Sequence, residues 1–178
     1  MAKDKAIAAV SATIRGLLEQ SASGVEFAGV RFKVYQAKDL QASEPGVVSI
    51  YLYRASVNTF HRNVPLGIAP SGRRQVPPLG LDLHYLVTAW EPDPLKQQMH
   101  LGWAARILED NPILPASMLN LYFEPGIFAD AESVELAVEP LSLAEEADIW
   151  RVATVNRQPS LSYVARRVDI ESRRVPPL

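Results

Sequence analysis

The sequence has no cysteine, which excludes disulfides, thiolate metal ligands and cysteine nucleophiles together. It also has no uninterrupted apolar run of the length that a bilayer-spanning helix requires. Near the N-terminus, the charged residues Lys3, Asp4, Lys5 and Arg15 fall within a helical pattern, unlike a signal peptide with a continuous apolar centre. We therefore expect synthesis and assembly in the cytoplasm, without membrane insertion.

Motifs for catalysis and nucleotide binding are missing as well. Neither the P-loop nor the dinucleotide-binding glycine pattern occurs, and the 3 histidines lack the spacing of metal ligands. Asp82 and His84 share one side of an extended pattern, where a carboxylate could orient an imidazole as a general base, but no nucleophile motif accompanies them. The alternative is a polar pair on the outer side of a sheet. We expect no catalytic residue, no cofactor and no metal, with a small hydrolase using Asp82 and His84 as a distant alternative.

Positive charge is absent from one long segment. No Lys or Arg occurs between Ile107 and Trp150, where half of the 20 acidic residues stand, whereas arginine dominates from Arg151 onward. Either these segments are neighbours in the fold and neutralise each other, or they form an acidic and a basic flank suited to head-to-tail association of copies. The net charge of −2 and the lack of a basic stripe interleaved with aromatics argue against nucleic acid as a partner.

With 178 residues, the chain is long enough for one hydrophobic core and too short for two comfortable domains. We therefore treat residues 1–178 as a single domain. Within it, residues 61–78 contain 4 of the 14 prolines and predict a loop or arm, which in a compact domain usually has a function. Residues 171–178 predict an exposed tail.

Residues 79–115 predict a strand, a capped turn, a helix and a stop. Apolar residues alternate in a way that predicts a half-buried strand, with these side chains on one face: Leu81, Leu83, Tyr85, Val87 and Ala89. Asp93 stands at an N-cap position, and Pro94 suits the first helical position because no amide donor is needed there. The helix that follows has an apolar stripe of Leu95, Met99, Trp103 and Ile107, and Asn111 and Pro112 end it.

The remaining elements alternate irregularly. Helices are predicted at residues 4–20 and from Ser142, where Glu145 completes a capping box. Strands are predicted around residues 30–34, 47–56, 134–140 and 160–170, and residues 111–133 are predicted to be irregular. This order does not fit a doubly wound sheet. It predicts an α/β (α+β) domain with a mixed or mainly antiparallel sheet of about five strands, covered by two to three helices.

Three blocks of the sequence, in this order, carry a resemblance to a known family. They are IYLYRASVNTFHRN (50–63), LGLDLHYLVTAWEPDPLKQQMHLGWAARILEDNPILP (79–115) and DIWRVATVNRQPSLSYVARRVDI (148–170). As a set they resemble the cap, or tail-terminator, proteins of phage-tail-like contractile injection systems of the antifeeding-prophage and virulence-cassette type. Some members of this family extend further at the C-terminus.

The resemblance implies a tail-terminator fold and a structural role. Such a protein forms a ring, a homohexamer, at the distal end of the inner tube and contractile sheath, where it stops tube growth and holds the last sheath ring. Its partners are other copies of itself and the inner-tube and sheath proteins, not a small-molecule substrate. After assembly in the cytoplasm it is part of a phage-tail-like particle that is released or stays in the cell. A phage tail-completion or head–tail joining protein is the alternative.

Contacts between copies, or with tube and sheath, are expected to involve charged and polar residues from the three blocks, the arm and the charge-biased segments. The candidate interface residues are Arg54, Asn58, Arg62, Arg73, Arg74, Glu145, Glu146, Arg166 and Arg167. Arginine side chains suit such contacts because the guanidinium group forms bidentate bonds with carboxylates.

Overall fold

A six-stranded sheet forms the centre of the protein in the computed structural model, which describes residues 2–58, 67–68, 74–153 and 156–172. Its strands are β1 (Arg31–Tyr35), β2 (Val47–Val57), β5 (Leu79–Trp90), β6 (Ile113–Pro115), β7 (Ser133–Val138) and β8 (Ser160–Ile170). They lie in the order β1-β2-β5-β8-β7-β6, and only the β1–β2 pair is parallel. The prediction of a mixed, mainly antiparallel sheet is therefore confirmed, with six strands in place of about five.

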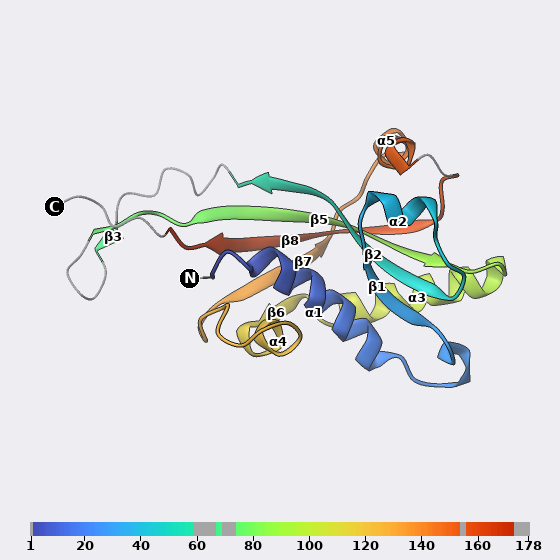
Figure 1. Cartoon of the computed structure of the whole chain (residues 1–178), viewed down its shortest axis with the longest axis horizontal. Coiled ribbons are helices and arrows are strands. Elements are labelled where there is room, and N and C mark those ends of the chain that lie inside the picture. The colour runs from blue at the N-terminus through green and yellow to red at the C-terminus, as the bar shows by residue number, and fades with distance from the viewer. Residues whose placement is uncertain (1, 59–66, 69–73, 154–155, 173–178) are drawn as a thin grey trace.

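Helices cover both faces of the sheet (Figure 1). The helices are α1 (Ala6–Ser21), α2 (Ala37–Gln41), α3 (Pro94–Glu109), α4 (Ala116–Leu121) and α5 (Leu143–Ala153), with one 3-10 turn at Val25–Phe27. We call the face toward α1, α3 and α4 the inner face and the face toward α2 and α5 the outer face. Of the arm, the structure describes residues 67–68 and 74–78, which include two short strands that pair with each other, β3 (Gly67–Ile68) and β4 (Arg74–Gln75).

Strand β5 is buried on both faces, so the prediction of a half-buried strand is wrong. On the inner face, Leu83, Tyr85 and Val87 are fully buried, as the alternation predicts. On the outer face, Leu86 and Trp90 belong to a second apolar cluster with residues of α2 and α5. The rings of Trp90 and Trp150 meet there edge to face, with centroids 5.8 Å apart. The two short outer helices therefore shield the face that the sequence pattern assigns to solvent.

Helix α3 begins as predicted, but only the second half of the predicted stripe, Trp103 and Ile107, packs against the core. The Asp93 carboxylate accepts hydrogen bonds from the backbone N–H groups of Leu95 and Lys96, which confirms the N-cap. However, the side chains of Leu95 and Met99 are 75% and 44% exposed. The buried face consists of Gln97, His100, Leu101, Ala104 and Leu108. Gln97 is accommodated there because its amide donates to the backbone oxygen of Ala89.

Residues 111–133 are more regular than predicted, because they contain β6 and α4. Strand β6 pairs with β7 at the edge of the sheet. In the last turn of α4, the Asn120 side chain accepts hydrogen bonds from the N–H groups of Ile127 and Phe128 and donates to the Phe128 oxygen. Helices α1 and α4 come so close that a Cβ on Gly16 would lie 2.2 Å from the Tyr122 ring. A local glycine therefore permits this packing.

At one end of the molecule, β5 and β8 continue past the helical layers, and β2 continues past the outer helices (left in Figure 1). The start of the chain adds one short parallel bridge to this end. The Ala2 N–H donates to the Asp169 oxygen, and the Glu171 N–H donates to the Ala2 oxygen. This end presents sheet surface, in contrast to the covered middle of the molecule.

Candidate interaction surfaces

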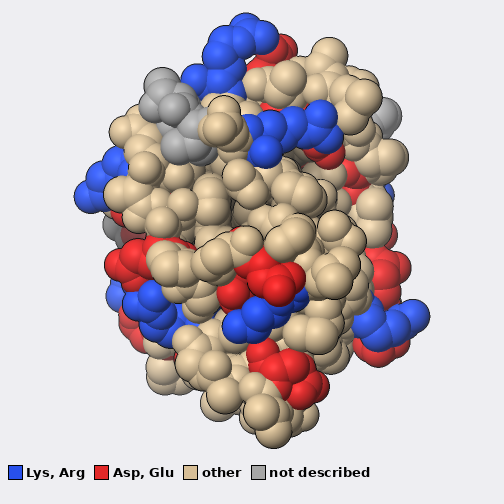
Figure 2. Space-filling view, turned by 90° about the vertical axis from the view of Figure 1, so that its right-hand side faces the viewer, with Lys and Arg blue, Asp and Glu red and all other residues tan. Residues whose placement is uncertain are grey.

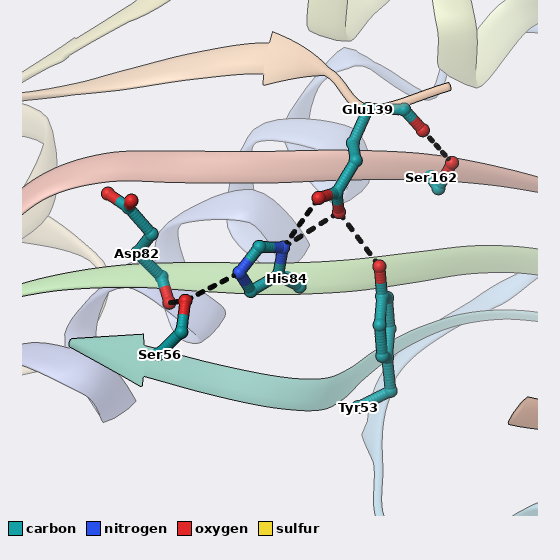
Figure 3. Close-up of polar contacts among 6 residues, drawn as sticks. All are labelled: Tyr53, Ser56, Asp82, His84, Glu139 and Ser162. Atoms are coloured by element: carbon teal, nitrogen blue, oxygen red, sulfur yellow. Dashed lines mark hydrogen bonds and ion pairs between the residues drawn. The ribbon is translucent and has the colours of Figure 1, made fainter. Parts of the chain in front are cut away.

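A chain of polar side chains crosses the outer face where the helical cover ends (Figure 3). Ser56 Oγ on β2 lies 2.8 Å from His84 Nε2 on β5, and His84 Nδ1 lies 2.8 Å from each carboxylate oxygen of Glu139. The Tyr53 hydroxyl donates to Glu139 at 2.8 Å, and Ser162 on β8 donates to the Glu139 backbone oxygen. We call Tyr53, Ser56, His84 and Glu139 the polar chain. It ties β2 and β5 to the segment that follows β7.

Asp82 and His84 share the outer face, as predicted, but Asp82 does not orient the imidazole. The Asp82 carboxylate accepts from the Asn58 amide at 3.2 and 3.3 Å, whereas Glu139 bonds to His84 Nδ1. The order Ser56–His84–Glu139 matches that of a hydrolytic triad. Yet Ser56 lies within a paired strand, opposite Asp82, and not at the sharp strand-to-helix turn that exposes a nucleophile. The geometry favours a structural role for the polar chain.

Burial and then the hydrogen bond to Glu139 raise the pKa of the Tyr53 hydroxyl. The hydroxyl is therefore a donor to the carboxylate throughout the neutral range. His84 is only 7% exposed, so an imidazole without these partners would be a buried polar group with lost hydrogen bonds. The polar chain is thus a candidate for fixing the relative positions of the strands at the start of the uncovered sheet.

Truncation of Glu139 to alanine is expected to lower the free energy of unfolding by about 2 kcal/mol, because His84 and the Tyr53 hydroxyl both lose the carboxylate that accepts their hydrogen bonds. Glu139→Gln should cost less, because an acceptor oxygen is retained. The matched control is Glu135→Ala on β7, whose carboxylate forms no hydrogen bond or ion pair within the described residues and whose loss should cost about 0.5 kcal/mol or less. Urea denaturation of the three variants measures this, and equal losses at both glutamates would contradict a special role for Glu139.

Three candidate interface arginines lie on the exposed sheet surface. Arg54 is exposed on β2 opposite His84, and Arg166 is exposed on β8 opposite Glu135. Arg167 has a φ of 65° where the pairing of β5 and β8 shifts register, so a β-bulge aims this side chain out of the regular ladder. Within the described residues, no hydrogen bond or ion pair engages these three guanidinium groups.

The structure describes the next candidate interface residues to different extents. Asn58 is engaged with Asp82 at the end of β2. Arg62 and Arg73 lie outside the described residues, and Arg74 is described only through the backbone of β4. Their participation in an interface stays a prediction.

Glu145 and Glu146 already have partners within the chain. The Ser142 N–H and hydroxyl both donate to the Glu145 carboxylate at 2.8 Å, which confirms the capping box, and these bonds lower the pKa of Glu145. The stabilisation from this cap is therefore present above the usual glutamate pKa and is lost as the pH falls through the lowered value. Glu146 forms an ion pair with Arg157 at 2.5 Å.

Much of the charge separation along the sequence is neutralised in the fold. The acidic segment forms the pairs Lys5–Glu124, Arg106–Asp110, Arg151–Asp148 and Arg157–Glu146. At the end of the molecule that lies on the right in Figure 1, positive and negative side chains are interspersed (Figure 2). The arginines of β8 are different, because Arg166 and Arg167 have no such pair within the described residues. Arg166 and Arg167 are thus two unpaired positive charges at adjacent positions of β8, which reaches the uncovered end of the sheet.

Sequence reasoning missed the polar chain because its members come from distant positions. His84 and Glu139 are 55 positions apart, and Tyr53 and Glu139 are 86 apart. Only the alternation that places Ser56 and His84 on outward positions is visible in the sequence. The register that brings them together depends on the bulge between Leu52 and Arg54.

The fold of this chain is similar to that of two terminator caps of contractile injection systems. Its structure resembles the sheath/tube terminator of a PVC extracellular contractile injection system, in the extended state, with a TM-score of 0.66, 18% identity and coverage of 94% of this chain and 57% of the other. It also resembles the tube-terminating cap of the anti-feeding prophage, with a TM-score of 0.65, 17% identity and coverage of 95% and 56%. The chain therefore spans a little over half the length of these terminators.

Residues 9–177 match the model of the Pvc16 N-terminal domain family, and the chain belongs to this family. The resemblance read from the three sequence blocks is thereby confirmed. None of the curated proteins compared with the chain matches it. Among the described helices, none has the length and apolar character to cross a bilayer.

Proposed function

We propose that this protein is a tail terminator that forms a hexameric ring at the distal end of an inner tube and contractile sheath. The ring stops tube growth and holds the last sheath ring. The observation that carries this proposal is the match of the fold to two terminator caps over more than nine-tenths of the chain. Assembly takes place in the cytoplasm, and the protein then becomes part of a phage-tail-like particle.

This function needs complementary surfaces and no enzymatic centre. A ring subunit requires one face for the tube end, one for the last sheath ring and two flanks that fit each other. The uncovered end of the sheet, with free arginines on β2 and β8, supports an interface at this end. We propose that Arg54, Arg166 and Arg167 contact carboxylates of neighbouring subunits, and that Arg62, Arg73 and Arg74 of the arm make such contacts as well.

Particles made without this gene test the proposal directly. Electron microscopy should show tubes of over-long, broadly distributed length, or sheaths that lose their end, because nothing limits addition of tube subunits. Restoring the gene should restore a narrow length distribution. Particles of normal length and stability in the absence of the gene would overturn the proposal.

A further inference from the structure

Strand β1 is an edge strand whose outward backbone groups have no partner among the described residues. β1 pairs only with β2, in parallel, and the Arg31 N–H donates to the Gly46 oxygen on that side. Because successive residues of a strand point their backbone groups to opposite sides, the N–H and C=O groups of Phe32 and Val34 point away from β2. An extended chain could therefore pair with this edge.

A hollow of about 530 Å³ lies along the same edge. Its lining includes Arg15 from α1, Phe32, Lys33 and Val34 from β1, and Asp39 and Glu44 from α2 and the turn after it. Figure 1 shows β1 at the rim of the sheet, between α1 and α2. The edge is thus the floor of a groove with a helix on each side, which is the arrangement that allows a peptide to add as a further strand.

The charges in this groove are satisfied on one side only. Glu44 pairs with Arg31 at 2.6 Å and with Lys33 at 3.1 Å, and Asp39 accepts from the Gln36 N–H at 2.9 Å. By contrast, Arg15 is only weakly paired, because its buried Nε has no hydrogen-bond partner and its ion pair with Glu19 on the same helix is long, at 4.0 Å. The Arg15 side chain is nevertheless 40% exposed, so a carboxylate entering from outside would pair with the accessible part of its guanidinium group.

We propose that the groove along β1 binds an extended acidic peptide segment of a partner protein by strand addition. Backbone bonds to Phe32 and Val34 hold the segment, and one acidic side chain on its inner face pairs with Arg15. On the same face of the bound segment, the residues before and after this acidic residue are apolar, because they contact Val34, which is 43% exposed. This site is separate from the arginines of β8 and does not depend on ring formation.

A second copy of this chain is a poorer occupant. In the described residues, the acids that lie on strands, Asp82, Glu135 and Asp169, belong to β5, β7 and β8, which are already paired. The other described acids lie on helices, turns or connecting segments, and several are already paired within the chain, including Glu44, Glu91 and Glu124. An acid from the described part of a second copy would therefore come from a paired strand, a helix, a turn or a connecting segment, and not from an unpaired strand.

The test uses the purified full chain and a short fluorescent peptide. Threonine occupies every second position of the peptide, and valine, glutamate and valine, in this order, occupy the positions between. On strand addition, one face of this peptide presents valine and glutamate toward α1, and the other presents threonine. We expect saturable binding by fluorescence anisotropy. Glutamine in place of the glutamate should weaken binding about tenfold, and N-methylation of alternate peptide amides should abolish it.

Two protein variants locate the site. Val34→Pro removes an N–H group that points to the open edge, a position where proline is tolerated, and should weaken binding at least about tenfold. Arg15→Gln should remove the preference for glutamate over glutamine while leaving the weaker binding intact. Arg106→Gln on α3, a matched loss of one arginine away from the groove, should change neither.

The Arg15 variants keep the test decisive if Val34→Pro fails to fold. Absence of peptide binding by the folded wild-type protein overturns the proposal. Equal binding of the glutamate and glutamine peptides also overturns it, because the acidic specificity is then wrong. Self-association that Val34→Pro abolishes, without peptide binding, would assign the edge to a second copy and overturn the acidic-peptide proposal.

Discussion

Replacing Arg166 and Arg167 by glutamate is expected to prevent ring assembly. Each exposed ion pair contributes only about 1 kcal/mol or less, but a ring repeats the contact at every interface, and reversal turns each attraction into repulsion. The summed effect on a hexamer is therefore on the order of several kcal/mol per ring. Light scattering of the purified protein at low and high salt measures the assembly size. Wild-type assembly should weaken as salt rises, since salt screens exposed charges.

The control for this variant must separate assembly from folding and from net charge. The double variant Lys38→Glu, Arg106→Glu changes the net charge by the same amount as the β8 double variant, but its substitutions lie on α2 and α3. It should leave assembly intact. Because Arg166 lies opposite Glu135, a glutamate there places two like charges across β7 and β8 and lowers stability slightly. Arg166→Gln with Arg167→Gln avoids that repulsion and should weaken assembly to a lesser degree. An unchanged assembly size in both β8 variants, with the fold intact, would contradict the proposed contact.

Local signals account for most of what the sequence predicts correctly. The inward positions of β5 follow from an alternation that only adjacent residues determine. Asp93 caps α3, and Ser142 with Glu145 caps α5, through bonds that span a few residues. The three-block resemblance likewise depends on contiguous sequence. These features need no knowledge of the tertiary structure.

Long-range packing decides the features that the sequence does not predict. Periodicity shows that Leu95 and Met99 share a helix face, but not which face of α3 meets the core. The buried face contains His100, which is accommodated because its ring bonds to the Glu26 oxygen and stacks on Phe27. Burial of Leu86 and Trp90 depends on α2 and α5, which join the sheet from distant parts of the chain. Short elements such as β6 are stabilised by their neighbours and carry weak signals of their own.

The polar chain and the exposed arginines also depend partly on local sequence and partly on long-range packing. The alternation in the sequence places Asp82 and His84 on one face, and the structure confirms this placement. Glu139 meets His84 only because β8 lies between β5 and β7 and fixes their register. The sequence also does not show that Arg166 and Arg167 lack ion pairs. This depends on which acidic residues form ion pairs with other cations in the folded protein.

Truncation of Tyr85 to alanine is expected to lower the free energy of unfolding by about 3 to 5 kcal/mol, as for other large aromatic side chains removed from a core. Tyr85 is fully buried on the inner face of β5, under α1, so its removal leaves a cavity between the sheet and the helix. Its hydroxyl lies 2.9 Å from Ser11 Oγ on α1. Urea denaturation, followed by circular dichroism, measures the loss.

Tyr85→Phe separates the hydrogen bond from the packing. It keeps the ring and should cost only about 1 kcal/mol, because Ser11 retains its bond to the Ile7 oxygen. Burial also raises the pKa of Tyr85, so the wild-type protein has a stabilising contribution that begins to fall as the pH rises above about 10, where the unfolded chain ionises. The phenylalanine variant should lack this alkaline loss. Equal costs for Tyr85→Ala and Tyr85→Phe would show that the ring is not packed between β5 and α1, and would contradict the inner core described here.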